Sequence, residues 1–129
     1  MAQHNIFGKI GEDFASEYLI KKGYIIRDRN WRFENIEVDI VAEKKNTIII
    51  VEVKTRKLNT LSAIKSIDQK KQTQLLKAAN IYTKGLTLSY NAQIDVICVI
   101  GDNPENFRIE HIPNAIRPKL RHARGRLIK

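Results

Sequence analysis

Two runs of apolar residues near the middle of the chain, residues 36–43 and 47–54, are separated by the polar residues 44–46. Both runs are rich in Val and Ile, the residue types that favour strands. Residues 48–51 are apolar at every position, which indicates a strand buried on both of its faces. The pattern therefore predicts a β-hairpin in the centre of a sheet, with residues 44–46 as its turn.

A helix is predicted before this hairpin, from about Asn5 to Lys22. Asn5 is a suitable N-cap, and Gly23 is a suitable residue to end the helix. Gly8 and Gly11 lie beside the apolar stripe, so this side of the helix can approach a sheet closely. The apolar stripe recurs at helical spacing and consists of Phe7, Ile10, Phe14 and Tyr18.

A second helix is predicted after the hairpin, beyond the polar loop of residues 56–65. Ser66 with Gln69 three residues later forms a capping box at its start, and Gly85 ends it. The residues expected on its buried side are Leu75, Leu76, Ala79 and Tyr82.

Three further strands are predicted at residues 24–33, 93–100 and 107–112, and residues 101–106 are rich in turn formers. Together the elements predict the α/β class, with a mixed central sheet flanked by helices in the order α-β-β-β-α-β-β. A length of 129 residues fits one domain. We expect that domain to cover residues 1–112.

The chain is strongly basic, with a net charge of +9 and an isoelectric point of about 9.8. This charge points to an anionic partner, nucleic acid rather than a membrane surface. Residues 113–129 contain six Lys or Arg residues and no acid, so they form a basic C-terminal tail. Such a tail can hold phosphate backbones, or it can serve only to keep the protein in solution.

One cysteine, Cys98, excludes an internal disulfide and is expected to be a small core residue. No signal sequence is apparent, and the longest apolar run is too short to cross a bilayer. We therefore expect a cytoplasmic protein without a membrane partner. The three histidines, His4, His111 and His122, are scattered and match no zinc or triad spacing.

The charged residues of the hairpin are the candidates for chemistry, and the strand register decides which of them meet. A two-residue loop, Lys45-Asn46, places Asp39 directly across from Glu52, and a four-residue loop gives the same pairing. A three-residue loop sends Asp39 to the opposite face of the sheet. Asn46 tolerates the left-handed conformation of a two-residue turn, which favours the first register.

Two facing carboxylates repel each other unless a cation lies between them. Mg²⁺ suits this position because it prefers oxygen ligands and usually needs only one or two carboxylates. Lys54, two residues after Glu52 on the same face, could then stabilise negative charge on a phosphate. The structural alternative is an ordinary cross-strand salt bridge between Glu37 and Lys54. Glu12 also has a structural alternative, because its spacing alone fits a solvent-exposed acid in the first turn of a helix.

Several short motifs, taken with the order of elements, resemble a known family. Over residues 8–112 the chain resembles the YraN family of small bacterial proteins. The core of that family resembles the restriction-endonuclease-like PD-(D/E)XK nucleases, especially archaeal Holliday-junction resolvases. The motifs are Gly11-Glu12, Asn30-Trp31-Arg32, Glu37-Val38-Asp39, the run Val-Glu-Val-Lys-Thr-Arg at residues 51–56, Lys71, and Gln93-Ile94-Asp95-Val96.

The resemblance implies roles for individual residues. Asp39 and Glu52 would be ligands of Mg²⁺ or Mn²⁺, Lys54 would orient the attacking water or stabilise the phosphate, and Glu12 would complete the acidic cluster. The implied catalytic residues are thus Glu12, Asp39, Glu52 and Lys54. The implied nucleic-acid-binding residues are Arg32, Arg56 and Lys71.

Three functions follow as hypotheses. The first is a Mg²⁺-dependent endonuclease acting on DNA, branched DNA included. The second is a nucleic-acid-binding protein with a nuclease-like fold and no turnover, and the third is a partner-binding domain in which Glu37–Lys54 is only a salt bridge. Because the resolvases act as symmetric dimers, the resemblance also implies a homodimer.

Overall fold

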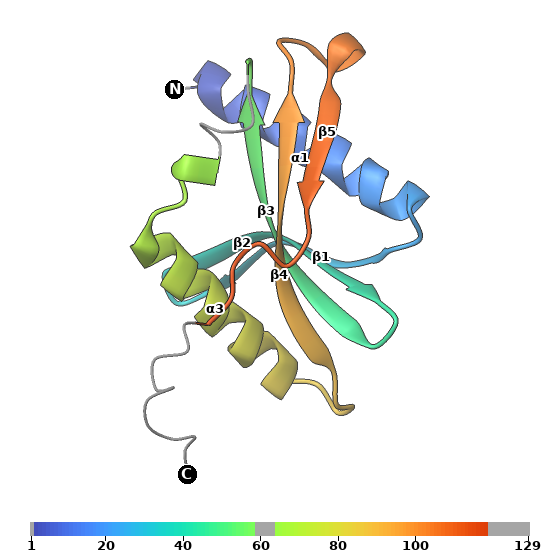
Figure 1. Ribbon diagram of the computed structural model, residues 1–129, viewed down its shortest axis with the longest axis vertical. Helices are drawn as coiled ribbons and strands as arrows, with labels where there is room; N and C mark the ends of the chain where they lie inside the picture. The colour runs from blue at the N-terminus through green and yellow to red at the C-terminus, as the bar shows by residue number, and fades with distance from the viewer. Residues whose placement is uncertain (1, 59–63, 119–129) are drawn as a thin grey trace.

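The structure is a computed structural model of the chain and describes residues 2–58 and 64–118. A five-stranded sheet in the order β1-β2-β3-β4-β5 is its centre (Figure 1). The α/β class and the order α-β-β-β-α-β-β are both confirmed. In chain order the elements are α1 (Ala2–Lys21), β1 (Ile25–Phe33), β2 (Ile36–Lys44), β3 (Thr47–Arg56), α3 (Gln69–Lys84), β4 (Asn91–Ile100), the 3₁₀ helix η1 (Pro104–Asn106) and β5 (Arg108–Ile112).

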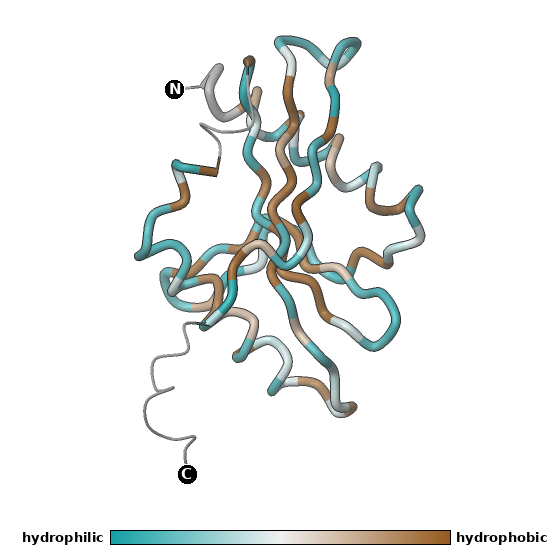
Figure 2. The backbone as a smooth tube through the Cα atoms, in the orientation of Figure 1, coloured by the Kyte–Doolittle hydropathy of each residue, from teal (hydrophilic) through white to brown (hydrophobic). Residues whose placement is uncertain are grey.

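The sheet is mixed because one of its connections is a helix. Strands β3 and β4 are parallel and are joined through α3, whereas the other neighbouring pairs are antiparallel. A parallel pair needs such a crossover, because a tight turn can only reverse the chain. In the order of the strands β3 is the central one and β4 lies beside it, and hydrophobic residues concentrate along this part of the backbone (Figure 2).

Two apolar clusters, one under each helix, hold the layers together. Leu19 of α1 packs with Ile40, Val51 and Ile97, and we call this the α1 cluster. Leu75 of α3 packs in a second set of residues, the α3 cluster. The α3 cluster also includes Val38, Val41, Ile48, Ile50, Ile94, Val96 and the expected core residue Cys98. Burial of these aliphatic side chains from water supplies the main driving force for folding.

The β2–β3 hairpin has the two-residue turn that its sequence predicts. Lys45 and Asn46 both have positive φ, 50° and 61°, as a tight hairpin turn requires. Lys44 pairs with Thr47, which fixes the register. The last pair of the β2–β3 ladder is Ile40 with Val51. The strands separate beyond that pair, just before the two carboxylates of interest.

Strand β2 does not keep the strict alternation of faces that a regular strand has. Val38 and Val41 are three residues apart, yet both pack in the α3 cluster, whereas Ile40 packs in the α1 cluster. A regular strand sends residues three apart to opposite faces. Glu37, Asp39 and Val41 therefore do not all share one face of the sheet, because β2 bends around Asp39.

Helix α1 begins earlier than expected and lies very close to β3. Its range of Ala2–Lys21 places Asn5 inside the helix, so the expected N-cap at Asn5 is wrong. A Cβ atom added to Gly11 would lie within 3.0 Å of three Thr55 side-chain atoms. Only a glycine permits this approach of the helix to β3.

Helix α3 is capped by Asp68 and not by Ser66. The Asp68 side chain accepts a hydrogen bond from the Lys71 backbone N–H at 2.8 Å. The expected helix end at Gly85 is confirmed. Of the expected buried residues, Leu75 and Ala79 are buried, and Leu76 and Tyr82 are partly buried against the same cluster.

The chain after β5 stays in contact with the sheet as far as it is described. The Ala115 N–H donates a hydrogen bond to the Ile94 carbonyl at 2.7 Å, and Ile116 is buried in the α3 cluster. Most of the predicted basic tail, residues 119–129, lies outside the described residues. Across residues 2–58 and 64–118, no helix is long and apolar enough to cross a membrane.

Candidate carboxylate and lysine site

The candidate site forms where β2 and β3 part. The Asp39 side chain accepts a hydrogen bond from the backbone N–H of Val53 at 2.8 Å. That N–H belongs to a residue just past the end of the β2–β3 ladder, so the carboxylate takes the place of a missing ladder acceptor. The bend in β2 thus turns Asp39 toward β3.

Asp39 is an unusual carboxylic acid because of its surroundings. Burial, and then the neighbouring Glu52 carboxylate, raise the pKa of Asp39 from 3.8 to about 7. Glu12 raises it further, while the Val53 hydrogen bond and the Lys71 ammonium group lower it. The negative charges of Glu52 and Glu12 thus both oppose ionisation of Asp39. A cation added among them would favour the charged form of Asp39.

Glu52 is a buried carboxylate, only 4% exposed. Lys54 lies 3.3 Å from Oε2 of Glu52, and Lys71 of α3 lies 3.7 Å from Oε1. Both lysines are thus within ion-pair distance. Even so, Oε1 of Glu52 is buried and has no hydrogen-bond partner in the described part of the chain. A buried carboxylate oxygen without a hydrogen bond is costly, so this oxygen is suited to an additional cationic ligand.

The alternative salt bridge between Glu37 and Lys54 does not form. Glu37 pairs with Arg32 of β1 at 3.4 Å, and Lys54 pairs with Glu52. The β2–β3 ladder ends at Ile40 and Val51, so Glu37 and Lys54 are no longer held opposite each other. The prediction of a Glu37–Lys54 salt bridge, on which the structural alternative rested, is therefore wrong.

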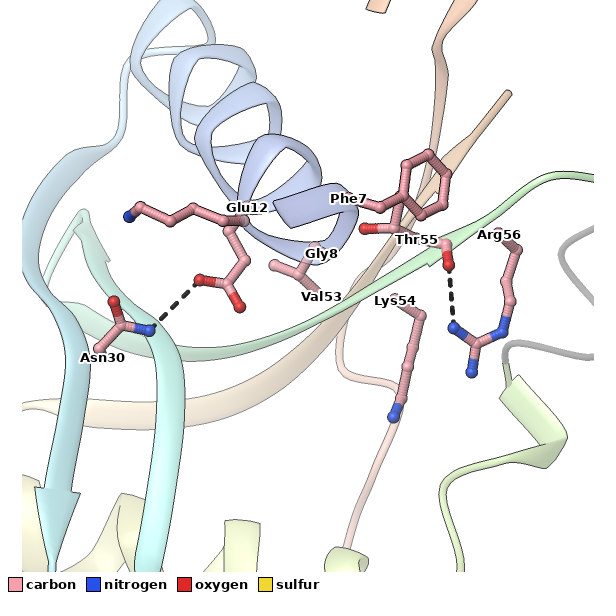
Figure 3. Close-up of a pocket in the computed structure, with 9 residues that line it drawn as sticks. Phe7, Gly8, Glu12, Asn30, Val53, Lys54, Thr55 and Arg56 are labelled. Carbon is pink, nitrogen blue, oxygen red and sulfur yellow. Dashed lines mark hydrogen bonds between the residues drawn. The ribbon is translucent and has the colours of Figure 1, made fainter. Parts of the chain in front are cut away.

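Glu12 reaches the same region from α1. Oε1 of Glu12 accepts a hydrogen bond from the side-chain amide of Asn30 at 3.2 Å (Figure 3). Arg29 pairs with Ile40 and Trp31 with Val38, so Asn30 lies opposite Asp39 between β1 and β2. Asn30 therefore connects Glu12 with the strand position next to Asp39. No individual role was predicted for Asn30.

A cavity of about 390 Å³ opens beside Glu12, between α1 and the C-terminal half of β3. Figure 3 shows Phe7, Gly8 and Glu12 of α1 on one side of β3, with Lys54 extending from the strand in the opposite direction. We call this space the Gly8 cavity. Its lining residues are Phe7, Gly8, Lys9, Glu12, Asn30, Val53, Lys54, Thr55 and Arg56.

The donor set can be compared with the needs of a divalent ion. Among residues 2–58 and 64–118, no group of three or more His, Cys, Asp or Glu side chains is close enough to hold a metal. Mg²⁺ does not need three, because one or two carboxylates with waters and substrate phosphate suffice. Asp39 and Glu52 are hard oxygen donors, and Glu52 has a buried oxygen without a hydrogen bond. The residues present therefore fit such an ion.

The three residues predicted to bind nucleic acid surround this site. Arg32 is exposed and pairs with Glu37. Arg56 lines the Gly8 cavity, and Lys71 also donates a hydrogen bond to the Glu37 carbonyl at 3.4 Å. The fold thus brings cations from β1, β3 and α3 to the same end of the sheet as the carboxylates.

A second polar cluster, away from these carboxylates, was not predicted. Asp95 is fully buried and lies 2.7 Å from Nε2 of His111, and Nδ1 of His111 lies 2.9 Å from the Tyr18 hydroxyl. Asp95 also accepts hydrogen bonds from the Gln93 side chain and the Asn114 backbone N–H. No spacing in the sequence joins these residues, because they come from α1, β4, β5 and the segment after it.

The fold and this site define a class: an α/β protein whose mixed five-stranded sheet carries carboxylates and lysines where two central strands part. The model of the uncharacterised protein family UPF0102 matches residues 11–99. The chain belongs to that family.

Individual relatives cover nearly the whole chain. A UPF0102 protein of Bacteroides thetaiotaomicron is 48% identical over 122 residues, which are 93% of this chain and 99% of that protein. One from Flavobacterium johnsoniae is 43% identical over 89% of this chain and 97% of its own length. One from Parabacteroides distasonis is 35% identical over 89% and 95%, respectively. The expected membership of the YraN family is confirmed.

Proposed function

We propose that this protein hydrolyses phosphodiester bonds in nucleic acid, DNA first of all, and that it does so in the cytoplasm with Mg²⁺ or Mn²⁺. The observation that carries the proposal is the pairing of Glu52 and Asp39. Glu52 has a buried oxygen without a hydrogen bond, and Asp39 has a pKa raised to about 7 by burial and by Glu52. Perturbed acids beside an open cavity are typical of catalytic sites.

Each residue has a task in this proposal. Asp39 and Glu52 hold the divalent ion, which when bound polarises the phosphate and makes an attacking water more acidic. Lys54, 3.3 Å from Glu52, stabilises the negative charge that develops on the phosphate. Glu12 adds a third carboxylate from the α1 side and orients water toward the phosphate.

The basic residues around the site position the strand. Arg32, Arg56 and Lys71 lie on three different elements around the carboxylates, so they can contact successive phosphates of one backbone. Such contacts provide affinity and orientation but no sequence preference. We therefore propose a structure-dependent nuclease, for which a branched DNA such as a four-way junction is the first substrate to test.

Incubation of the purified protein with labelled junction, flap, single-stranded, duplex and RNA substrates tests this function. Mg²⁺- or Mn²⁺-dependent cleavage is expected, and Asp39→Asn and Glu52→Gln should abolish it. Asp13→Asn is the matched control, since it removes an exposed carboxylate that follows Glu12 in the sequence and forms an ion pair with Arg29. Absence of any metal-dependent product lost in Asp39→Asn would count against the proposal.

A second candidate is nucleic-acid binding without turnover. It is favoured by the two lysines beside Glu52, because Lys54 and Lys71 already supply positive charge there. This candidate expects Asp39→Asn and Glu52→Gln to bind DNA as tightly as the wild type. In both candidates affinity falls steeply with salt. Metal-dependent cleavage is what separates them.

The resolvase-like part of the proposal includes a homodimer. Two active sites on one assembly can act on two strands of a junction, as a symmetric dimer permits. Light scattering at the concentration used for cleavage gives the mass in solution. A monomeric mass under those conditions would contradict the homodimer. It would not contradict cleavage of a single strand.

A further inference from the structure

Helix α1 contains two glycines, and only one of them is explained by packing. A side chain on Gly11 would collide with Thr55, so the contact of α1 with β3 requires glycine there. At Gly8, no atom apart from its chain neighbours and its own helix lies within 4 Å of the position of an added Cβ. Glycine inside a helix is destabilising relative to alanine. Nothing within the described protein compensates for this at Gly8.

The open space at Gly8 is the Gly8 cavity, with a volume of about 390 Å³. This volume is near the lower end of the roughly 300–1,000 Å³ typical of pockets that bind small ligands. One sugar with its base fits such a space, whereas a base pair with both backbones does not. The cavity adjoins the carboxylate site, because Glu12 and Lys54 line it.

The chemistry of the cavity walls suits a nucleotide. The Phe7 ring offers a surface for stacking a base, and Lys9 and Arg56 offer positive charge to phosphates. Gly8 lies on α1 between Phe7 and Glu12, beside β3 (Figure 3). A bare backbone at this point allows a sugar–phosphate chain to pass close to the helix.

Two of these groups are already held in place. The Phe7 ring packs edge to face against Phe107, with 6.1 Å between the ring centroids. The Arg56 guanidinium donates hydrogen bonds to the Thr55 carbonyl at 2.9 Å and to the Ser66 hydroxyl at 3.2 Å. A fixed aromatic ring and a fixed guanidinium lose little freedom on binding, which favours affinity.

We propose that the Gly8 cavity is a subsite for one unpaired nucleotide, next to the phosphate on which Asp39 and Glu52 act. This inference rests on the proposed function and adds the class of substrate to it. The substrate is a strand with an unstacked nucleotide at the cleavage point, as in a single strand, a flap or a branch. A continuous duplex does not place a nucleotide in the cavity unless one is unpaired first.

Substitution of Gly8 tests the subsite without touching the carboxylates. Gly8→Leu fills the cavity and Gly8→Ala begins to fill it, and the open space around the position predicts that both variants fold. Glu17→Leu places the same side chain on an exposed position of α1 and is the matched control. Thermal melting of each variant verifies that it is folded before any binding is measured.

The readout is fluorescence anisotropy of a labelled oligothymidylate of about 12 nucleotides, and of a duplex of the same length, in EDTA. The wild type should bind the single strand more tightly than the duplex. Gly8→Leu should weaken single-strand binding by about tenfold or more, Gly8→Ala by a smaller factor, and duplex binding should change by less than about twofold. Glu17→Leu should bind like the wild type.

Two results would overturn the subsite. One is a folded Gly8→Leu that binds the single strand as tightly as the wild type, and the other is a wild type with no preference for the single strand. Because EDTA removes divalent ions, these results do not depend on hydrolysis. If Gly8→Leu weakens binding but no substrate is ever cleaved, the proposed nuclease activity fails and the subsite stands. If cleavage occurs and Gly8→Leu is without effect on binding, only the subsite fails.

Discussion

The Asp39 carboxylate accepts a hydrogen bond from the Val53 backbone N–H at 2.8 Å, where a partner strand would otherwise supply the acceptor. The bond ties the bend of β2 to the open edge of β3. The hydrogen bond and the other surroundings of Asp39 act on its charge in opposite directions. The carboxylate must accept from Val53, and it also lies partly buried near Glu52 and Glu12, where negative charge is unfavourable.

Asp39→Asn should therefore stabilise the metal-free protein. The amide oxygen of Asn can still accept from Val53, while the charge that Glu52 and Glu12 oppose is gone. We expect the free energy of unfolding at pH 8 to increase, by at most about 4 kcal/mol, because each of the roughly three pH units between the unfolded and folded pKa of Asp39 contributes about 1.4 kcal/mol. Denaturant unfolding in EDTA measures it. A clear loss of stability, larger than that of Asp13→Asn, would show that the charged carboxylate itself stabilises the fold.

The stability of the wild type should depend on pH through the same group. The pKa of Asp39 is about 7 in the folded protein and near 3.8 in the unfolded chain, so between these values the folded state binds a proton that the unfolded state has lost. The contribution of Asp39 to stability is thus fully present below about pH 4 and is lost as the pH rises through 7. Its slope is at most about 1.4 kcal/mol per pH unit.

The measurement is the difference between wild-type and Asp39→Asn unfolding free energies across this pH range, in EDTA. Taking the difference removes the contributions of other titrating groups that the two proteins share. The Asp39→Asn variant should gain relative to the wild type as the pH rises from 4 to 7, and the difference should level off above 7. A difference that stays constant with pH would mean that Asp39 titrates at its ordinary pKa.

The contact between α1 and β3 yields a packing prediction. Gly11→Ala places a methyl group within 3.0 Å of three Thr55 side-chain atoms. We expect a loss of about 1–3 kcal/mol from overpacking, which outweighs the gain of about 1 kcal/mol from helix propensity. Thr55→Ala in the same chain should restore part of the loss. If Gly11→Ala alone raises the melting temperature, the close approach of α1 to β3 is absent in solution.

The hairpin register was predictable because local chemistry determines it. Asn46 adopts the left-handed conformation readily, and the two-residue turn then sets every pair from Lys44–Thr47 to Ile40–Val51. The cap of α3 was not predictable in the same way. Ser66 and Asp68 are both good capping residues two positions apart, so the local sequence does not decide between them.

The candidate site was predictable in its carboxylates but not in its contacts. The sequence indicated Asp39 and Glu52, because ionisable groups beside a buried strand are costly unless they are paired or bind a cation. It could not indicate that Lys54 pairs with Glu52 instead of Glu37, since that depends on where β2 leaves β3. Nor could it indicate the contact of Asn30 with Glu12, residues on different elements that only the packing of α1 brings together.

The buried Asp95–His111 contact should contribute strongly to stability. His111→Ala removes the partner at 2.7 Å from a carboxylate that is fully buried. Although Gln93 and the Asn114 N–H still donate to Asp95, breaking a buried pair costs about 3 kcal/mol. Denaturant unfolding at pH 7 measures the loss. Asp95→Asn in the His111→Ala background should recover part of it, and equal stability of His111→Ala and wild type would contradict the importance of the pair.

Two properties of Asn30, its backbone conformation and its side-chain hydrogen bond, can be tested separately. Its φ is +53°, which favours Asn or Gly, and its side-chain amide donates to Glu12 at 3.2 Å. Asn30→Gly keeps the backbone relaxed and removes the amide, whereas Asn30→Ala disturbs both. If the amide positions Glu12, Asn30→Gly should lower the rate of Mn²⁺-dependent cleavage by about tenfold or more, with little loss of stability.

Asn46→Gly is the matched control, since it removes an amide from another left-handed residue, in the β2–β3 turn. It should leave cleavage unchanged. Asn30→Gly and Glu12→Gln should also be non-additive, because once Glu12 no longer carries its charge the Asn30 amide has no carboxylate to orient. Full activity in Asn30→Gly, or additive losses in the double variant, would assign Asn30 a backbone role only.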